Sequence, residues 1–217
     1  MSSRSLNWWL PVAIAAILSA EGAAAGPLNG PDGDDPWMFR LRGIAVIPDA
    51  SADIDQIPGA SVDISDSGIP ELDISYFFTP NIAAELILAV TPHDITGTGA
   101  IAGVAVGDAW LLPPTLLAQY HVTDFGAFKP YVGAGINYTV FFDQDAAGGT
   151  ITQFNLEDTF APALQIGFDY FFDERWGVNL DVKKIFLRPD ITLNNGALTG
   201  DVTIDPWLIG FGIVFRP

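Results

Sequence analysis

Charged side chains recur at every second position in several segments of the sequence. Arg40 and Arg42 are two residues apart, as are Glu71 and Asp73. This spacing places such side chains on one face of a β-strand, where they can form buried ion pairs. The residues expected to form a charged plug in this way are Arg40, Arg42, Asp73, Glu85, His121, Lys129 and Asp169.

Other chemistry has little support in the sequence. There is no Cys, and His93 and His121 are the only histidines, so thiolate metal sites and cysteine nucleophiles are excluded. A Ser/His pair of a lipid-modifying barrel enzyme would need His93, but no GxSxG motif accompanies it. The formal net charge of −17 argues against nucleic-acid binding. We therefore expect no enzyme activity, no cofactor and no metal site.

Eight segments must position these side chains. Apolar and polar residues alternate in each of them, which is typical of strands with one buried face. Each segment is long enough for a tilted crossing of a bilayer, which takes about 9–11 residues. The segments are 37–47, 71–78, 81–90, 112–122, 129–140, 159–172, 176–183 and 207–215.

The linkers between these strands alternate in length. Three are short (79–81, 123–128, 173–175) and four are long (48–66, 93–106, 143–157, 189–200), as in a transmembrane meander. We expect the long linkers to be extracellular loops and both termini to be periplasmic. The long linkers carry acidic residues and no Lys or Arg, which predicts a solvated anionic surface. Calcium binding by pairs such as Asp53 and Asp55 is conceivable, but no EF-hand spacing is present.

A soluble periplasmic β-protein and an outer-membrane barrel both fit alternating strands. Aromatic residues gather near both ends of the strands, as at two bilayer interfaces, which favours the barrel. The prediction is an all-β, eight-stranded antiparallel transmembrane β-barrel in the cell outer membrane, with Leu86, Ile136 and Phe168 facing lipid. Lys184 also falls on the lipid face, so it needs a bulge or must extend to the interface.

The N-terminus has the pattern of a secretory signal. Residues 1–25 contain a basic residue, an apolar stretch and an Ala-Ala-Ala cleavage sequence. Residues 26–36 are rich in Gly, Pro and Asp and predict a flexible tail. The barrel is expected over 37–217.

Four motifs carry a resemblance to a known family. LLPPTLLAQYH (111–121), KPYVGAGINY (129–138), NLDVKK (179–184) and DPW (205–207) resemble the outer membrane protein W (OmpW/AlkL) family. The resemblance implies a barrel with a narrow apolar channel for small hydrophobic molecules. Such barrels usually end in an aromatic residue that the barrel-assembly machinery recognises, whereas Phe215 is followed here by Arg216 and Pro217.

Inward positions in the outer half of the strands are mostly apolar. We expect Ile87, Leu111, Thr139, Ala163, Ile185 and Leu208 to line a substrate channel. Pro113 and Pro114 cannot donate to a strand ladder, so they mark either a lateral gap toward lipid or a bulge that only shapes the barrel.

The predicted function is passive uptake of small hydrophobic molecules. The channel would end on the charged plug and open sideways, in contact with outer-membrane lipid and lipopolysaccharide. The alternative is a structural or envelope-stress barrel whose loops bind partners and which transports nothing.

Overall fold

The computed structural model describes residues 35–217, so the predicted signal peptide and all but the last two residues of the predicted tail lie outside the described residues. The described part is built from fifteen strands and one short 3-10 helix, η1 (Asn194–Gly196). The strands are β1 (Trp37–Ile47), β2 (Ser51–Ile54), β3 (Ala60–Ile64), β4 (Ser67–Phe77), β5 (Ile82–Ala89), β6 (Thr91–Gly99), β7 (Ala105–Leu112), β8 (Thr115–His121), β9 (Phe128–Ala146), β10 (Phe154–Leu156), β11 (Thr159–Phe171), β12 (Trp176–Ile185), β13 (Asp190–Leu193), β14 (Leu198–Thr203) and β15 (Trp207–Phe215).

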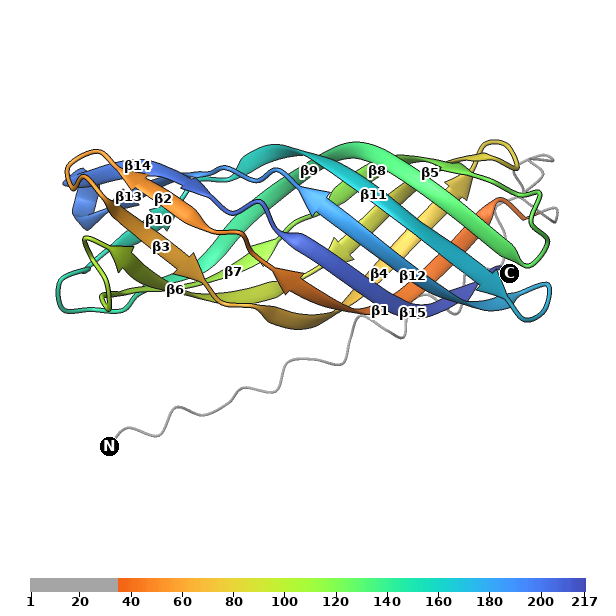
Figure 1. Ribbon diagram of the computed structural model, residues 1–217, viewed down its shortest axis with the longest axis horizontal. Coiled ribbons are helices and arrows are strands. Elements are labelled where there is room, and N and C mark those ends of the chain that lie inside the picture. The colour runs from red at the N-terminus through yellow and green to blue at the C-terminus, as the bar shows by residue number, and fades with distance from the viewer. Residues whose placement is uncertain (1–34) are drawn as a thin grey trace, which may run out of the picture.

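Eight of the described strands close an antiparallel barrel, as predicted. Their order is β1-β4-β5-β8-β9-β11-β12-β15, and β15 pairs back onto β1. Phe39, for example, is in register with Phe215 on one side and Ile74 on the other. The barrel is long and narrow, and short turns join its strands at the end where the C-terminus lies (Figure 1).

Burial along these strands follows the predicted alternation. Ile136 is 57% exposed on the outer face, whereas Arg40 and Asp73 are fully buried inside. The lipid-facing band ends in exposed aromatic residues such as Trp176 and Phe160. In the described residues there is no helix long and apolar enough to cross a membrane.

The long linkers are not the loops that we expected. They contain β2, β3, β10 and β13, most of β6, and parts of β7, β9 and β14, which extend the barrel at the end opposite the short turns (Figure 1). The reason is that short alternations such as Val62/Ile64 and Ile191/Leu193 place apolar side chains inside, while interspersed Gly and Thr weaken the signal. The acidic residues of this extension lie on its outer surface. Asp201 is in register with Asp190, and a hydrogen bond between them raises the pKa of Asp201.

The extension consists of two four-stranded sheets. One has the order β3-β6-β7-β9, and the other has the order β10-β13-β14-β2. Their inner faces share a continuous apolar core with the outer half of the barrel, from Ile44 through Ile95 to Leu193. The extension is therefore packed inside and is not an open funnel.

Lys184, which was predicted to face lipid, does so without a bulge in its strand. The ladder between β11 and β12 stays regular past Leu164 and Lys184. The Lys184 ammonium donates to the backbone carbonyl of Asp205 and lies 4.7 Å from the centre of the Trp207 ring. Because both partners sit at the aromatic belt, the side chain reaches the interface, which is the second of the two expected solutions.

Candidate functional site

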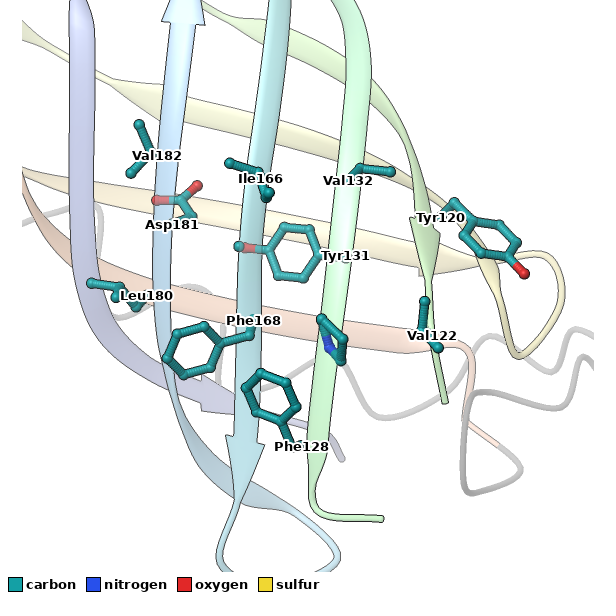
Figure 2. A pocket seen from close by; sticks show the side chains of 12 residues that line it. Tyr120, Val122, Phe128, Tyr131, Val132, Ile166, Phe168, Leu180, Asp181 and Val182 are labelled. Carbon is teal, nitrogen blue, oxygen red and sulfur yellow. The ribbon is translucent and has the colours of Figure 1, made fainter. Parts of the chain in front are cut away.

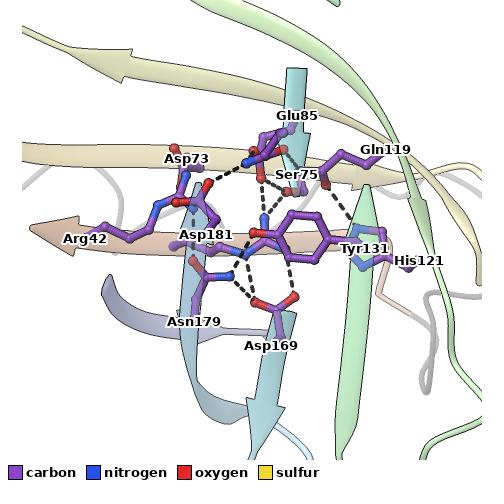
Figure 3. Close-up of polar contacts among 12 residues, drawn as sticks. Arg42, Asp73, Ser75, Glu85, Gln119, His121, Tyr131, Asp169, Asn179 and Asp181 are labelled. Carbon is purple, nitrogen blue, oxygen red and sulfur yellow. Dashed lines mark hydrogen bonds and ion pairs between the residues drawn. The ribbon is translucent and has the colours of Figure 1, made fainter. Parts of the chain in front are cut away.

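Arg40 is the centre of a buried ion-pair network in the periplasmic half of the barrel. Figure 3 shows its partners Ser75, Glu85 and Asp169. Its Nε and one terminal nitrogen reach the two carboxylate oxygens of Asp169 at 2.9 and 2.7 Å. The other terminal nitrogen contacts Glu85 and donates to Ser75 Oγ at 3.0 Å. Such a bidentate pair fixes the guanidinium plane as well as neutralising charge.

Arg42 forms a second set of ion pairs one step higher in the barrel. It lies 2.9 Å from Glu71, 2.7 Å from Asp181 and also in contact with Asp73. Lys183 joins this set, at 2.6 Å from Glu71 and 3.1 Å from Asp181.

Amides join the two sets into one layer across the barrel. Gln165 Nε2 donates to both Glu85 (3.0 Å) and Asp181 (2.7 Å), and Gln165 Oε1 accepts a hydrogen bond from Gln119 Nε2 (2.7 Å). His121 bonds Gln119 at 3.0 Å and stacks on Tyr131. We call this layer the charged floor.

The structure brings five of the seven predicted plug residues, Arg40, Arg42, Asp73, Glu85 and Asp169, directly into ion pairs of the floor. His121 borders it through Gln119, and Lys129 lies toward the periplasm, where its ammonium donates to the carbonyl of Thr123 at 3.0 Å. Sequence reasoning left Glu71, Lys183 and Tyr131 out of the plug, although their inward positions follow from the same alternation.

Beneath the floor, a second layer of apolar side chains closes the periplasmic end. Met38, Phe77, Ala83 and Val214 are at most 1% exposed and pack together. Arg216 lies over the ring of Phe171 beside them. The interior is thus sealed toward the periplasm by a charged layer and an apolar layer.

Above the floor the interior is apolar and nearly full. The six predicted channel residues are at most 7% exposed. Five of them, all except Ala163, surround a cavity of about 40 Å³. That space holds a few water molecules and is far below the ~300–1,000 Å³ of ordinary ligand pockets. An apolar guest therefore has to displace side chains here.

Pro113 and Pro114 interrupt the barrel wall beside this cavity. The β5–β8 ladder ends at Ile87 and Thr115, and the β6–β7 ladder starts at Thr91 and Leu111. Between them, 88–90 and 112–114 face each other with no ladder pair among the described residues. The carbonyl of Pro113 accepts hydrogen bonds from Asn137 of β9 (3.1 Å) and from Thr115 of the same segment (3.0 Å), so neither bond crosses to 88–90.

A second interruption, which the sequence analysis missed, lies on the other side of the same chain segment. The β4–β5 ladder stops at Glu71 and Ala89, and the β3–β6 ladder resumes at Ile64 and Ile95. Pro70 and Pro92 fall in this interval and lack backbone N–H donors. Val90 therefore lies in both interruptions, whereas Thr91 and Pro92 are paired with Leu111 and Trp110 on one side.

His93 sits at the edge of that interval. Its Nδ1 lies 2.6 Å from the Ser65 carbonyl oxygen and its Nε2 lies 3.0 Å from Thr91 Oγ1. Burial lowers the pKa of His93, against the opposing effect of the Ser65 carbonyl and of Asp66 and Asp94. It is therefore a neutral hydrogen-bonding residue of the wall at pH 7.

A larger hollow, of about 370 Å³, lies over β8, β9, β11 and β12 (Figure 2). The side chains of Val132, Ile166 and Leu180 around it are 39–62% exposed and point outward. This hollow therefore opens toward lipid, and Tyr131 and Asp181, whose side chains belong to the interior, lie at its base.

Comparison with known proteins identifies the family. The model of the OmpW family matches residues 35–216. The chain belongs to the OmpW family. It is 51% identical over 217 residues to the uncharacterized outer-membrane protein y4mB of Sinorhizobium fredii, covering 94% of each chain. OmpW-family membership, this relative and the barrel place the protein in the outer membrane.

Two further OmpW-like proteins are informative. The dibenzothiophene metabolism operon protein PahQ of Pseudomonas aeruginosa is 29% identical over 187 residues, covering 83% of this chain and 88% of PahQ. The crystal structure of the outer membrane protein OprG from Pseudomonas aeruginosa superposes with a TM-score of 0.77 at 29% identity, covering 82% of this chain and 94% of OprG.

Proposed function

We propose that this protein takes up small hydrophobic molecules passively across the outer membrane. The observation that carries the proposal is the apolar interior above the charged floor. The wall is lined mainly by apolar side chains such as Ile87, Leu111 and Leu208, so a polar solute finds few hydrogen-bond partners there, whereas an apolar one gives up none. Each CH₂ transferred from water gains about 0.8 kcal/mol, so binding strengthens with chain length until the space is filled.

The proposed path ends above the floor. An alkyl chain cannot replace the hydrogen bonds of Arg40 and Arg42, so continuing to the periplasm would break buried ion pairs. The plug residues Arg40, Arg42, Asp73, Glu85, His121, Lys129 and Asp169 act together as this barrier.

The exit is sideways, into the lipid. Pro113 lines the cavity and belongs to the interrupted ladder between 88–90 and 112–114. The hydrogen bonds to the Pro113 carbonyl come from Asn137 on β9 and from Thr115 in the same segment, so neither of them has to break when 88–90 and 112–114 separate. An apolar molecule leaving here avoids the aqueous periplasm.

The relatives agree with this substrate class. PahQ is named for an operon of dibenzothiophene metabolism, and dibenzothiophene is an apolar aromatic compound. We propose that the present chain likewise takes up apolar compounds of this kind. Assembly by the barrel machinery and contact with lipopolysaccharide complete the proposal.

Uptake of a fluorescent alkyl probe by cells producing each variant tests the proposal. Leu208→Asp hydrates the cavity and is expected to reduce uptake to the level of cells without the protein, while the volume-conserving Leu208→Met leaves it within twofold. Replacing Pro113 and Pro114 by Val restores ladder donors and is expected to slow release.

Normal uptake by Leu208→Asp would refute the interior route and leave the alternative, a structural or envelope-stress barrel without a transported substrate. If only the Val-Val variant is as fast as the parent, the interior route stands and the exit lies elsewhere.

A further inference from the structure

The two sheets of the extension meet along two seams without a backbone ladder, one between β2 and β3 and one between β9 and β10. Strand β9 pairs with β11 up to Thr139 and Thr159, and above that point its residues 140–146 face β10. Strand β10 pairs with β13 on its other side. The wall of the extension therefore has a slit between β9 and β10, from Thr139 up to the turn at Gly148 and Ile151.

Side chains close this slit in place of a ladder. Gln144 Oε1 accepts from the Leu156 backbone N–H at 2.6 Å, and its Nε2 donates to the Leu156 carbonyl at 3.2 Å. Lower down, Asp158 Oδ1 accepts from the Phe141 N–H at 2.9 Å. The Gln144 amide thus substitutes for a peptide group, and rotation of one side chain removes its closure without breaking any backbone pair.

A hollow of about 400 Å³ lies on the outer side of this slit. Gln144, Asp145 and Asn155 are among its lining residues, and Phe154 forms part of its wall. Phe154 and Leu156 are 7% and 3% exposed and belong to the apolar core that continues down to the cavity at Leu208. The side chain of Phe154 therefore borders both the hollow and the apolar interior.

We propose that the slit between β9 and β10 is the port through which an apolar molecule reaches the interior, and that Gln144 is its latch. This inference rests on the proposed function. Opening the slit exposes apolar core to water, which is unfavourable unless an apolar guest covers it. The open state is thus stabilised by the class of molecule that the interior accepts and by no polar solute.

Cross-linking tests the port, because the chain has no cysteine of its own. Asp145→Cys with Asn155→Cys places one thiol on each side of the slit, and a short bis-methanethiosulfonate reagent joins them until a reductant removes it. Uptake of the fluorescent alkyl probe is expected to fall at least fivefold on cross-linking and to recover on reduction.

The matched control is Asp53→Cys with Asp201→Cys, two exposed residues in register across the continuous β2–β14 ladder. Cross-linking this pair joins strands that are already fixed, so uptake is expected to stay within twofold of the untreated cells. An equal loss in both pairs, or no loss in the slit pair, would overturn the port.

Gln144→Ala tests the latch and is expected to raise the uptake rate at least twofold. Its control is Gln56→Ala, since Gln56 makes comparable bonds to Thr199 (2.9 and 3.2 Å) just beyond the end of the β2–β14 ladder. If Gln144→Ala is no faster than Gln56→Ala, the latch is wrong. If the parent itself takes up no more probe than cells without the protein, the proposed function fails, and the port fails with it.

Discussion

The two halves of the interior are built from the same alternating strands but are held together by different kinds of contact. In the periplasmic half, Arg40 and Arg42 form ion pairs with carboxylates from strands far apart in the sequence, and these directional contacts fix the positions of the side chains in the layer. In the outer half, Ile87 and Leu208 make only dispersion contacts, which carry no directional demand. A guest can replace the second kind of contact and not the first, so the boundary between the halves limits how deep an apolar molecule goes.

The largest expected effect is the loss of stability on removing a cation from the charged floor. Arg40→Ala leaves Glu85 and Asp169 buried without their cation, which should cost about 3–5 kcal/mol of stability. Urea unfolding in lipid vesicles measures the change. Arg175→Ala, in an exposed turn, serves as the control and should shift stability by less than about 0.5 kcal/mol. An equally small loss of stability in Arg40→Ala and Arg175→Ala would mean that ion pairs do not hold the floor together.

The substitution Ile185→Ala tests whether a guest binds in the apolar half of the interior. Loss of this cavity-lining side chain should cost about 2–5 kcal/mol while enlarging the space for a guest. Uptake of a branched alkyl probe should therefore rise relative to a linear one. Ile166→Ala, 62% exposed on the lipid face, should leave the ratio unchanged. A ratio that does not respond to Ile185→Ala would contradict guest binding in this half.

The smallest effect concerns His93, near the top of the cavity. Its pKa is lowered by burial, so the folded state binds a proton less readily than the unfolded state. The stabilisation is therefore complete above the ordinary histidine value of about 6.5 and is lost as the pH falls through the lowered pKa. Thermal unfolding at pH 8 and pH 5.5 should show a smaller pH difference for His93→Gln than for the parent. An unchanged difference would assign the pH response to other groups.

Much of the barrel was predictable because alternation is a local property. Arg40, Asp73 and Asp169 face inward for the same reason that Ile136 faces lipid, and eight such segments fix the strand count. The partners were not predictable, since the pairing of Arg40 with Asp169 depends on how strands are staggered around the closed barrel.

The strands of the extension were predicted as loops for a different reason. Segments such as Thr91–Gly99 contain Pro, Gly and Thr, and only Ile95 is strongly apolar, so their pattern is typical of loops. They become strands because the neighbouring segments supply ladder partners and a shared core. The Gln144 closure was equally hidden, because a lone polar residue in a strand gives no sign that it bonds the backbone of another sheet.

The central claim is that an apolar molecule occupies the outer half of the interior and stops at the charged floor. Anomalous diffraction from crystals grown with a bromoalkane measures this directly. The account predicts bromine density inside the barrel among Ile87, Leu111 and Leu208, and none between Arg40 and the periplasmic turns. Bromine below Arg40, or only on the lipid-facing surface, would contradict it.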